Sequence, residues 1–478
     1  MKKLLFSLLL LVSVSVLAQN GYEIRVTLKP FKKEYIYLGH YFGKSYPIVD
    51  SALLDENSQA IFKGNTSLNG GIYLLGFPNK SGFFEILVDK DQRFSVIADT
   101  ATLAKGVKFE NSKDNDLFNE YQQQMNNRGR QVSLLQQQLK DAKTKADSTQ
   151  IIASLTKADK DITDFREALI KNNAGSLLSD LLVAMREPVL TGALKDPRTK
   201  EDSAASYLYF KSHYWDGVNF FDGRMAYTTF FEDKLDKYFN QLIVPHPDSV
   251  IKEIDWMMGY ASASAEMTRF LLVKFVNKYI YQKYMWEDAV FVHLFEKYFS
   301  NKEYSWLSEK GKKTITDRAY SLMANIMGTP ASDIILPDSS AKMRALYDLT
   351  SAFSLVVFWD PTCGHCKEVL PRLDSFYREK WKGEGMKIYA VARETEGTRK
   401  DWLNFVNEKK LTEWTNVFYS KADDKERIDA GIPGYSQLYD VQSFPTLYLL
   451  DKDKRIIAKK LSVDQIDEII DVKLGKKQ

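Results

Sequence analysis

Cysteine is nearly absent from this 478-residue chain, which contains only Cys363 and Cys366. A framework of structural disulfides is therefore excluded. Histidine is also scarce, with five residues scattered along the chain, and no second CxxC or HxxxH pattern accompanies the two cysteines. No zinc site and no other metal is expected, because the remaining ligands are missing.

The chain also lacks an excess of one charge, since 66 basic and 63 acidic residues give a formal net charge of +3. No nucleic-acid partner is expected, because such proteins carry a strong basic surplus or stripe. Long apolar runs are absent except at the start, where Lys2 and Lys3 precede an apolar stretch ending at Leu17. This stretch is shorter than the ~20 residues of a spanning helix. Residues 1–18 are therefore predicted to be a secretory signal cleaved after Ala18, and not a membrane anchor.

The signal predicts export, and we expect a periplasmic protein that is soluble after cleavage. No cysteine follows the apolar stretch, which excludes the lipid-anchored form of such a signal, and no later segment has the length and apolarity of a transmembrane helix. The length predicts several domains, because one hydrophobic core rarely serves more than about 300 residues.

Residues 20–110 are rich in short alternating runs that are typical of β-strands. Val, Ile, Tyr and Phe alternate with polar residues in YEIRVTL, EYIYLGHYF, GGIYLLGF and QRFSVIA, and Gly, Asn, Lys and Asp separate the runs. The pattern predicts an antiparallel β sandwich, or a small barrel. Paired carboxylates and histidine clusters do not stand out in it, so a docking or spacer role is expected.

Residues 113–329 change to a helical period. A long, polar, proline-free stretch carries apolar residues at three- and four-residue spacing, as at Val132, Leu135 and Leu139. Two amphipathic helices, paired as a hairpin, are predicted here, and further helices make this an all-α region. Aromatic residues gather at positions 207–231, which a buried core explains better than a ligand groove.

Residues 331–478 alternate strand and helix patterns. The segment GTPASDIILPDSS interrupts the preceding helices with Pro330 and Pro337. Strand patterns SLVVFW, MKIYAVARE and PTLYLLD then alternate with helix patterns such as CKEVLPRLDSFYREKW. This order predicts a three-layer α/β domain. The expected fold class is a multidomain chain with an N-terminal antiparallel β sandwich, a central all-α region and a C-terminal α/β domain.

Both cysteines stand in FWDPTCGHCKEVLP, between a strand predicted to end at Trp359 and a helix. Free N–H groups and partial positive charge at a helix start favour a thiolate there. Cys363 is therefore predicted to be the exposed nucleophile, and Cys366, one turn deeper, the resolving thiol. His365 is predicted to stabilise the Cys363 thiolate. One helical turn brings two sulfurs within disulfide reach, although half of a zinc site or an inert disulfide would use the same spacing.

The stretch LVVFWDPTCGHCKEVLPRL resembles the thioredoxin superfamily, and specifically the TlpA-like periplasmic thiol–disulfide oxidoreductases. The resemblance covers residues 331–473 and implies a thioredoxin fold. It implies no cofactor other than the redox-active disulfide Cys363–Cys366. In that family a strand ending in Phe-Trp precedes the first cysteine, which makes Trp359 a candidate site residue. A proline follows the second cysteine by five residues, as Pro371 does here.

A second part of the resemblance lies in SFPTLYLLD. The family carries a cis proline that faces the disulfide, and Pro445 is the candidate for it. Its implied role is to leave the backbone of Phe444 free to pair with an extended substrate peptide. Pro361, in the turn before Cys363, is a further candidate substrate contact. The Gly-His dipeptide between the cysteines resembles that of protein disulfide isomerases.

Two positions depart from the family pattern. Cytosolic thioredoxins carry a buried Asp six residues before the first cysteine, where this chain has Val357. Some TlpA-like reductases carry Glu three residues after the second cysteine, where this chain has Val369 and places Glu368 one residue earlier. A one-residue shift turns a helical side chain by about 100°, so Glu368, a candidate for proton transfer, is expected to face solvent. Glu394 or Glu396 would replace it if their loop reaches the thiols.

The resemblance implies an exported oxidoreductase that exchanges disulfides with protein thiols of the cell envelope. Gly-His favours oxidation or isomerisation, whereas TlpA-like relatives are often reductants supplied by a membrane electron donor. Both directions stay open, with a membrane electron donor or acceptor as an expected partner. The regions before residue 331 resemble those placed before thioredoxin modules in exported Bacteroidota proteins. The competing hypothesis is an envelope binding or scaffold protein with an accessory redox-sensing thioredoxin module, because fold alone does not fix function.

Overall fold

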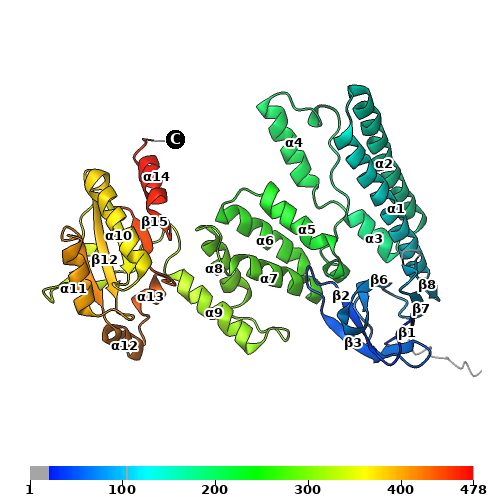
Figure 1. Ribbon diagram of the computed structural model, residues 1–478, viewed down its shortest axis with the longest axis horizontal. Coiled ribbons are helices and arrows are strands. Elements are labelled where there is room, and N and C mark those ends of the chain that lie inside the picture. The colour runs from blue at the N-terminus through cyan, green and yellow to red at the C-terminus, as the bar shows by residue number, and fades with distance from the viewer. Residues whose placement is uncertain (1–20, 104–105, 477–478) are drawn as a thin grey trace, which may run out of the picture. The chain divides into compact units, whose positions relative to one another are not determined.

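The computed structural model describes residues 21–103 and 106–476. The predicted secretory signal at residues 1–18 lies outside these described residues. Within them, no helix combines the length and the apolarity that crossing a bilayer requires. The chain, drawn in Figure 1, divides into two compact units, the first comprising Met1–Ile243 and Asp255–Leu271 and the second Val244–Ile254 and Leu272–Gln478.

The first unit begins with short strands that form two four-stranded sheets, with the orders β4-β1-β7-β8 and β3-β2-β5-β6. The bounds are β1 (Tyr22–Lys29), β2 (Tyr35–His40), β3 (Ile48–Leu53), β4 (Gln59–Gly64), β5 (Gly71–Gly76), β6 (Phe83–Val88), β7 (Arg93–Asp99) and β8 (Lys108–Glu110). Along β1, burial alternates with period two, and Ile24, Val26 and Leu28 join a core that both sheets share. The predicted β sandwich is therefore confirmed.

One strand pair differs from the prediction. β1 and β7 run parallel, with Ile24 opposite Phe94, whereas β1 with β4 and the pairs of the second sheet are antiparallel. Side chains alternate between the two faces in both arrangements. The sequence pattern therefore cannot fix the direction of a neighbouring strand.

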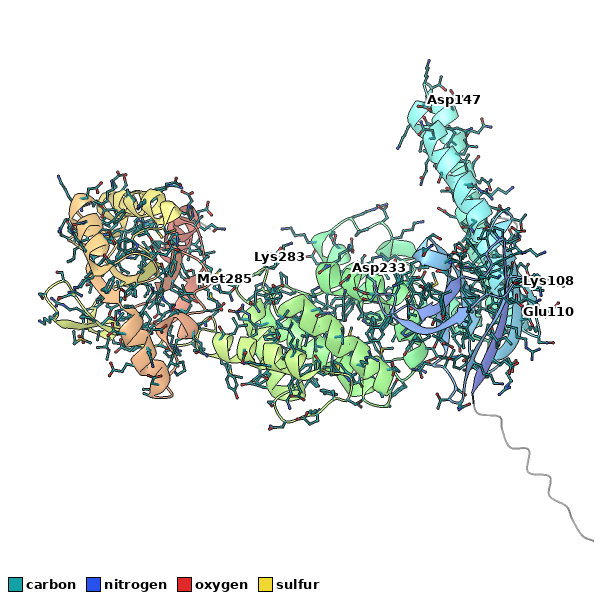
Figure 2. All side chains as sticks on the ribbon, turned by 60° about the horizontal axis from the view of Figure 1, so that its bottom comes forward. Lys108, Glu110, Asp147, Asp233, Lys283 and Met285 are labelled. Atoms are coloured by element: carbon teal, nitrogen blue, oxygen red, sulfur yellow. The ribbon has the colours of Figure 1, made fainter. Side chains whose placement is uncertain are left out.

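Helices α1 (Lys113–Asp141) and α2 (Lys145–Asn172) pack against each other as the predicted hairpin. Helix α2 starts at a side-chain cap, where the Thr144 hydroxyl accepts a hydrogen bond from the Asp147 N–H. Asp147 marks the free end of the hairpin, which extends away from the strands of this unit (Figure 2). Most side chains of both helices are exposed or half-buried, as their polar composition predicts.

Further helices of the first unit enclose an aromatic core. They are α3 (Leu177–Ala184), α4 (Lys200–His213), α5 (Phe230–Lys237) and the parts of α6 (Pro247–Ala261) and α7 (Ala265–Tyr279) that fall in this unit. Tyr214 and Phe231 are fully buried, and the ring of Trp215 packs edge-on against those of Phe220 and Tyr238. The aromatic cluster is therefore largely a packed core, which the sequence favours over a ligand groove.

The second unit contains the α/β region, whose five-stranded sheet has the order β13-β12-β11-β14-β15. Its strands are β11 (Phe353–Trp359), β12 (Met386–Arg393), β13 (Thr415–Tyr419), β14 (Thr446–Leu450) and β15 (Ile456–Lys459). β11 is central, parallel to β12 and antiparallel to β14. Every residue of β11 is buried, because both faces of the sheet are covered.

Side chains of β11 alternate between two cores, one on each face of the sheet. Val357 and Trp359 join the core that α10, α11 and α14 complete. Val356 and Phe358 join the opposite core, to which Leu336 and α13 also contribute. The predicted three-layer architecture is therefore confirmed. The bounds are β9 (Ile335–Pro337), β10 (Met343–Ala345), α10 (Gly364–Phe376), α11 (Arg399–Glu408), α12 (Lys421–Asp429), α13 (Tyr435–Leu438) and α14 (Val463–Lys473).

Helices α8 (Glu287–Tyr298) and α9 (Glu309–Met323) belong to the same unit as this sheet. Asp288 of α8 pairs with Lys459 of β15, and the two side chains are 4% and 3% exposed. Lys459 Nζ also donates to the backbone oxygen and to Oδ1 of Asn325, at 2.6 and 2.7 Å. Burial raises the pKa of Asp288 and lowers that of Lys459, so burial outweighs the mutual attraction of the two charges.

Candidate functional site

Cys363 and Cys366 lie where the chain passes from β11 into α10. Cys363 is the N-cap residue of α10, with φ −64° and ψ 122°, and it is half-buried. Cys366 lies one turn into the helix and is 0% exposed. Both are free thiols. The two thiols therefore differ in accessibility in the direction that the sequence predicts.

Asp360 shapes the turn between β11 and α10. Its buried Oδ1 accepts hydrogen bonds from the backbone N–H groups of Thr362, at 2.6 Å, and Cys363, at 3.1 Å. The Thr395 hydroxyl donates to Oδ2. An aspartate that bonds the backbone two residues on forms an Asx turn, so Asp360 sets the direction in which Cys363 enters the helix. From the sequence it is expected only to form a turn, although an aspartate between a buried strand and a helix start is a capping signal.

The surroundings of Cys366 favour its neutral form. Burial raises the pKa of the Cys366 thiol well above its usual range, and a hydrogen bond with Cys363 and the charge of Asp360 raise it further. A backbone hydrogen bond at Asp360 opposes this shift without outweighing burial. Because the thiolate is the reactive form of cysteine, Cys366 must lose its proton when it attacks another sulfur.

The difference in exposure between Cys363 and the buried, protonated Cys366 predicts selective alkylation of the reduced protein at neutral pH. Iodoacetamide should label Cys363, whereas Cys366 should react at least ~100-fold more slowly because it is buried and protonated. Peptide mass spectrometry measures the label at each position. The urea-denatured chain, which should label at both cysteines, is the control. Equal rates at the two cysteines of the native protein would contradict the assignment.

The loop before β14 forms the second part of the site. The Phe444–Pro445 peptide bond is cis, the conformation expected at this position from the sequence. The Phe444 carbonyl oxygen lies 3.7 Å from Cys363 Sγ. Among the described residues, the backbone N–H of Phe444 has no hydrogen-bond partner. Main-chain groups of an extended peptide could therefore pair with Phe444 beside the accessible thiol.

His365 and Glu368 lie on the exposed side of α10. Their side chains are 67% and 82% exposed, and His365 Nδ1 is 3.9 Å from Glu368 Oε2. Residues two apart on a helix do not face each other, so Glu368 and the buried Cys366 point to different sides. Glu368 faces solvent, as the one-residue shift predicts, and the structure does not bring it to the inner thiol. The role of His365 in stabilising a Cys363 thiolate stays a prediction.

Two expected site residues, Trp359 and Pro361, lie inside the protein. Trp359 is 0% exposed, and its ring centroid lies 5.0 Å from that of Phe405. Pro361 is buried, and a Cβ atom at Gly397 would approach Thr362 Cγ2 to 2.9 Å, so the loop after β12 lies against the turn. Trp359 lies in the core cluster that also contains Cys366, and Pro361 is buried where the loop after β12 lies against the turn. The assignments of Trp359 to catalysis and of Pro361 to substrate contact stay predictions.

The loop after β12 carries the two glutamates considered as proton acceptors. Glu394 accepts a hydrogen bond from the Lys421 N–H, at 2.8 Å, at the start of α12, and Glu396 is exposed. Thr395, between them, contacts the thiol turn through Asp360. This loop therefore reaches the site through a hydroxyl group, and neither glutamate takes the place expected for it.

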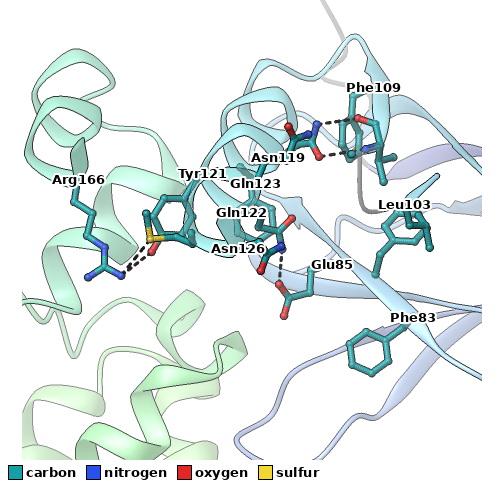
Figure 3. Close-up of a pocket in the computed structure, with 15 residues that line it drawn as sticks. Phe83, Glu85, Leu103, Phe109, Asn119, Tyr121, Gln122, Gln123, Asn126 and Arg166 are labelled. Carbon is teal, nitrogen blue, oxygen red and sulfur yellow. Dashed lines mark hydrogen bonds between the residues drawn. The ribbon is translucent and has the colours of Figure 1, made fainter. Parts of the chain in front are cut away.

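A separate cavity of about 560 Å³ lies in the first unit (Figure 3). Strands β6 and β8 and the two hairpin helices line it with aromatic and amide side chains. Asn119 bonds both backbone groups of Val107, and Gln122 donates to Glu85 Oε2 at 2.6 Å. These amide groups are paired with Val107 and Glu85, whereas the buried Nε of Arg166, which also lines the cavity, has no hydrogen-bond partner among the described residues.

Two family models match separate parts of the chain. Residues 353–456 match a family model described as thioredoxin-like. Residues 191–325 match a second family model, described as a domain of unknown function, DUF5106. No curated protein matches the chain.

Several solved structures are similar to parts of the chain. A thioredoxin-like protein from Bacteroides caccae is 21% identical with a TM-score of 0.42, and the match covers 60% of this chain and 98% of that one. A domain of a possible thiol-disulfide isomerase from Cytophaga hutchinsonii is 30% identical with a TM-score of 0.27, covering 32% and 97%. A thiol:disulfide interchange protein from Bacteroides sp. is 27% identical with a TM-score of 0.27, covering 31% and 91%.

Proposed function

We propose that this protein, whose residues 353–456 match the thioredoxin-like family model, is a thiol–disulfide oxidoreductase that acts through Cys363 and Cys366. The observation that carries the proposal is the unequal placement of the two thiols. One is accessible at the start of α10 and lies beside a cis proline loop, and the other is buried one turn further on. An accessible thiolate can begin an exchange, and a neighbouring thiol can complete it.

The proposed reaction begins when the Cys363 thiolate attacks one sulfur of a client disulfide. A bond forms between Cys363 and that sulfur, the client's own S–S bond breaks, and its second sulfur leaves as a thiolate. Cys366 then loses its proton and attacks Cys363 Sγ, which releases the first client sulfur and leaves a Cys363–Cys366 disulfide. Two electrons pass from the protein to the client, and the reverse sequence oxidises a client dithiol.

Client binding in this proposal uses the loop before β14. An extended client segment would pair with the backbone of Phe444, whose carbonyl oxygen is 3.7 Å from Cys363 Sγ. Backbone pairing tolerates many client sequences, because main-chain groups are the same in all of them. The substrate class is therefore extended protein segments that carry a cysteine or a disulfide.

We also propose that the chain acts outside the cytoplasm, on protein thiols and disulfides of the cell envelope. The basic start and the apolar run that ends at Leu17 support export. Each exchange changes the oxidation state of the thiol pair by two electrons. A membrane electron donor or acceptor would therefore have to restore the starting state after each turnover.

An insulin reduction assay tests the proposal. The intact chain should accelerate reduction of insulin by dithiothreitol by about tenfold or more, because the proposed client-binding loop holds the insulin disulfide beside Cys363. Cys363→Ser should lose this acceleration completely, since a hydroxyl cannot form the mixed disulfide. Circular dichroism confirms that the variant is folded. A folded wild-type chain that neither reduces insulin nor oxidises a reduced client would contradict the proposal and favour the scaffold hypothesis.

A further inference from the structure

The loop that carries the cis Phe444–Pro445 bond follows a buried carboxylate. Asp440 is 3% exposed and stands between α13 and β14, a few residues before the cis bond. Four side chains converge on this carboxylate, two from α9, one from the loop itself and one from the residue after β15. They are Arg318 Nη1 at 2.6 Å, Ser321 Oγ at 3.0 Å and Gln442 Nε2 at 2.9 Å, all to Oδ1, and Lys460 Nζ to Oδ2.

The backbone conformation at Asp440 is one that favours glycine, so the presence of an aspartate has to be explained by its side-chain contacts. Its φ of +45° lies in the left-handed region that favours glycine. The N–H of Asp440 donates to Gln437 O at 3.1 Å, and the N–H of Val441 donates to Ser436 O at 2.8 Å, which closes α13 in a Schellman motif. Glycine would fit this position with less strain but would bring no carboxylate. The contacts of Asp440 therefore account for an aspartate where the backbone alone favours glycine.

Arg318 connects this carboxylate to the helices before the α/β region. Its side chain, on α9, is 11% exposed. Besides Asp440, it binds Ile280 O through Nε at 3.0 Å and Gln282 Oε1 through Nη2 at 2.5 Å. Asn325, just after α9, donates to Leu438 O at 3.1 Å. Helix α9 and Asn325 therefore hold both the end of α13 and the start of the loop.

The other end of the loop is held by the sheet. Thr446, the first residue of β14, is paired with Phe358 on β11. The N–H of Lys460 donates to Leu447 O at 2.7 Å, so the residue that pairs with Asp440 also bonds β14. A short segment held at both ends has few conformations. Displacement of Asp440 would therefore move Phe444, whose carbonyl lies against Cys363.

We infer that Arg318 and Asp440 are positioning residues of the thiol site, and that through them the region matched by DUF5106 holds the client-binding loop in place. This inference rests on the proposed function, because it assumes that clients pair with Phe444. Neither residue has to touch a client. Displacement of a reacting or binding group by about 1 Å can lower rates on the order of 100-fold.

Kinetics with two disulfides of different size test the inference. Arg318→Met removes the guanidinium, and Asp440→Gly removes the carboxylate while suiting the positive φ. Both should raise KM for insulin about tenfold, because its chain needs the loop. The kcat/KM for 5,5′-dithiobis(2-nitrobenzoate), a small disulfide that needs only Cys363, should change less than about threefold. The matched control is Asp467→Asn, which removes a carboxylate 2.7 Å from Lys380 and should leave both values unchanged.

Hydrogen exchange followed by mass spectrometry gives a second readout that does not depend on activity. Residues 440–447 should exchange about tenfold faster in both variants, whereas β12 should keep its wild-type rates. Unchanged exchange at 440–447, or an equal loss of activity on both disulfides, would overturn the inference. A wild-type chain inactive on both disulfides would contradict the proposed function alone, and the exchange rates would still decide whether Arg318 positions the loop.

Discussion

Replacing Cys366 with alanine should turn the protein into a covalent trap. In the wild type, the buried Cys366 lies one helical turn from Cys363, so release of a mixed disulfide is intramolecular. Without it, only an external thiol can release the client, and release should slow by at least about 10³-fold. Non-reducing electrophoresis after mixing with insulin should show a stable adduct that disappears with dithiothreitol.

The matched variant is Cys363→Ala, which leaves the inner thiol alone. It should form no adduct, because Cys366 is 0% exposed and burial raises its pKa. Adducts with Cys363→Ala but not with Cys366→Ala would reverse the assigned roles. If neither variant forms an adduct while the wild type reduces insulin, exchange does not proceed through a mixed disulfide.

Asp288→Ala, which removes a buried carboxylate, should lower the free energy of unfolding by about 3–5 kcal/mol. Lys459 would then have to bury its ammonium group, or give up its proton, in a site where its side chain is 3% exposed and only the oxygens of Asn325 are its partners. Burial already shifts the pKa of both paired groups toward their neutral forms. The pair itself therefore adds little, and Asp288→Leu with Lys459→Met should lie within about 1 kcal/mol of the wild type or above it.

Urea unfolding followed by tryptophan fluorescence measures these differences. The control is the exposed pair Lys425–Asp429 on α12, whose side chains are 73% and 62% exposed. Asp429→Ala should change stability far less than Asp288→Ala, because exposed ion pairs contribute little. If the double substitution is as destabilising as Asp288→Ala alone, the attraction between the two charges contributes to stability beyond the packing of the two side chains.

The order of strands and helices can be predicted from the sequence, because each element encodes its own buried face. The alternation along β1 and the fully apolar β11 are examples. Pairings between distant elements are not encoded in this way. The parallel pairing of β1 with β7 leaves the side-chain pattern unchanged. Arg318 looks like any charged residue of an amphipathic helix, and its partner Asp440 follows 122 residues later.

The residues of the candidate site also fall into two groups, those that the sequence predicts and those that only the fold brings together. Cys363, Cys366 and Pro445 stand in short motifs, so spacing and family resemblance suffice to predict them. Asp360 and Thr395 meet across 35 residues, because the sheet places the end of β11 beside that of β12. Trp359 is next to the motif in sequence, and its position along β11 places the side chain in the core cluster that also contains Cys366. The sequence alone does not show on which face of the sheet that side chain lies.

The presence of both sulfhydryls within one helical turn, with no other cysteine in the chain, simplifies the folding of this protein. An unfolded chain has only one internal cross-link to form, so oxidative misfolding by scrambled pairings cannot occur within a single molecule. Wrong cross-links can arise only between molecules, as dimers that depend on concentration. A redox titration of the intact protein should accordingly give one two-electron midpoint that belongs to this site alone.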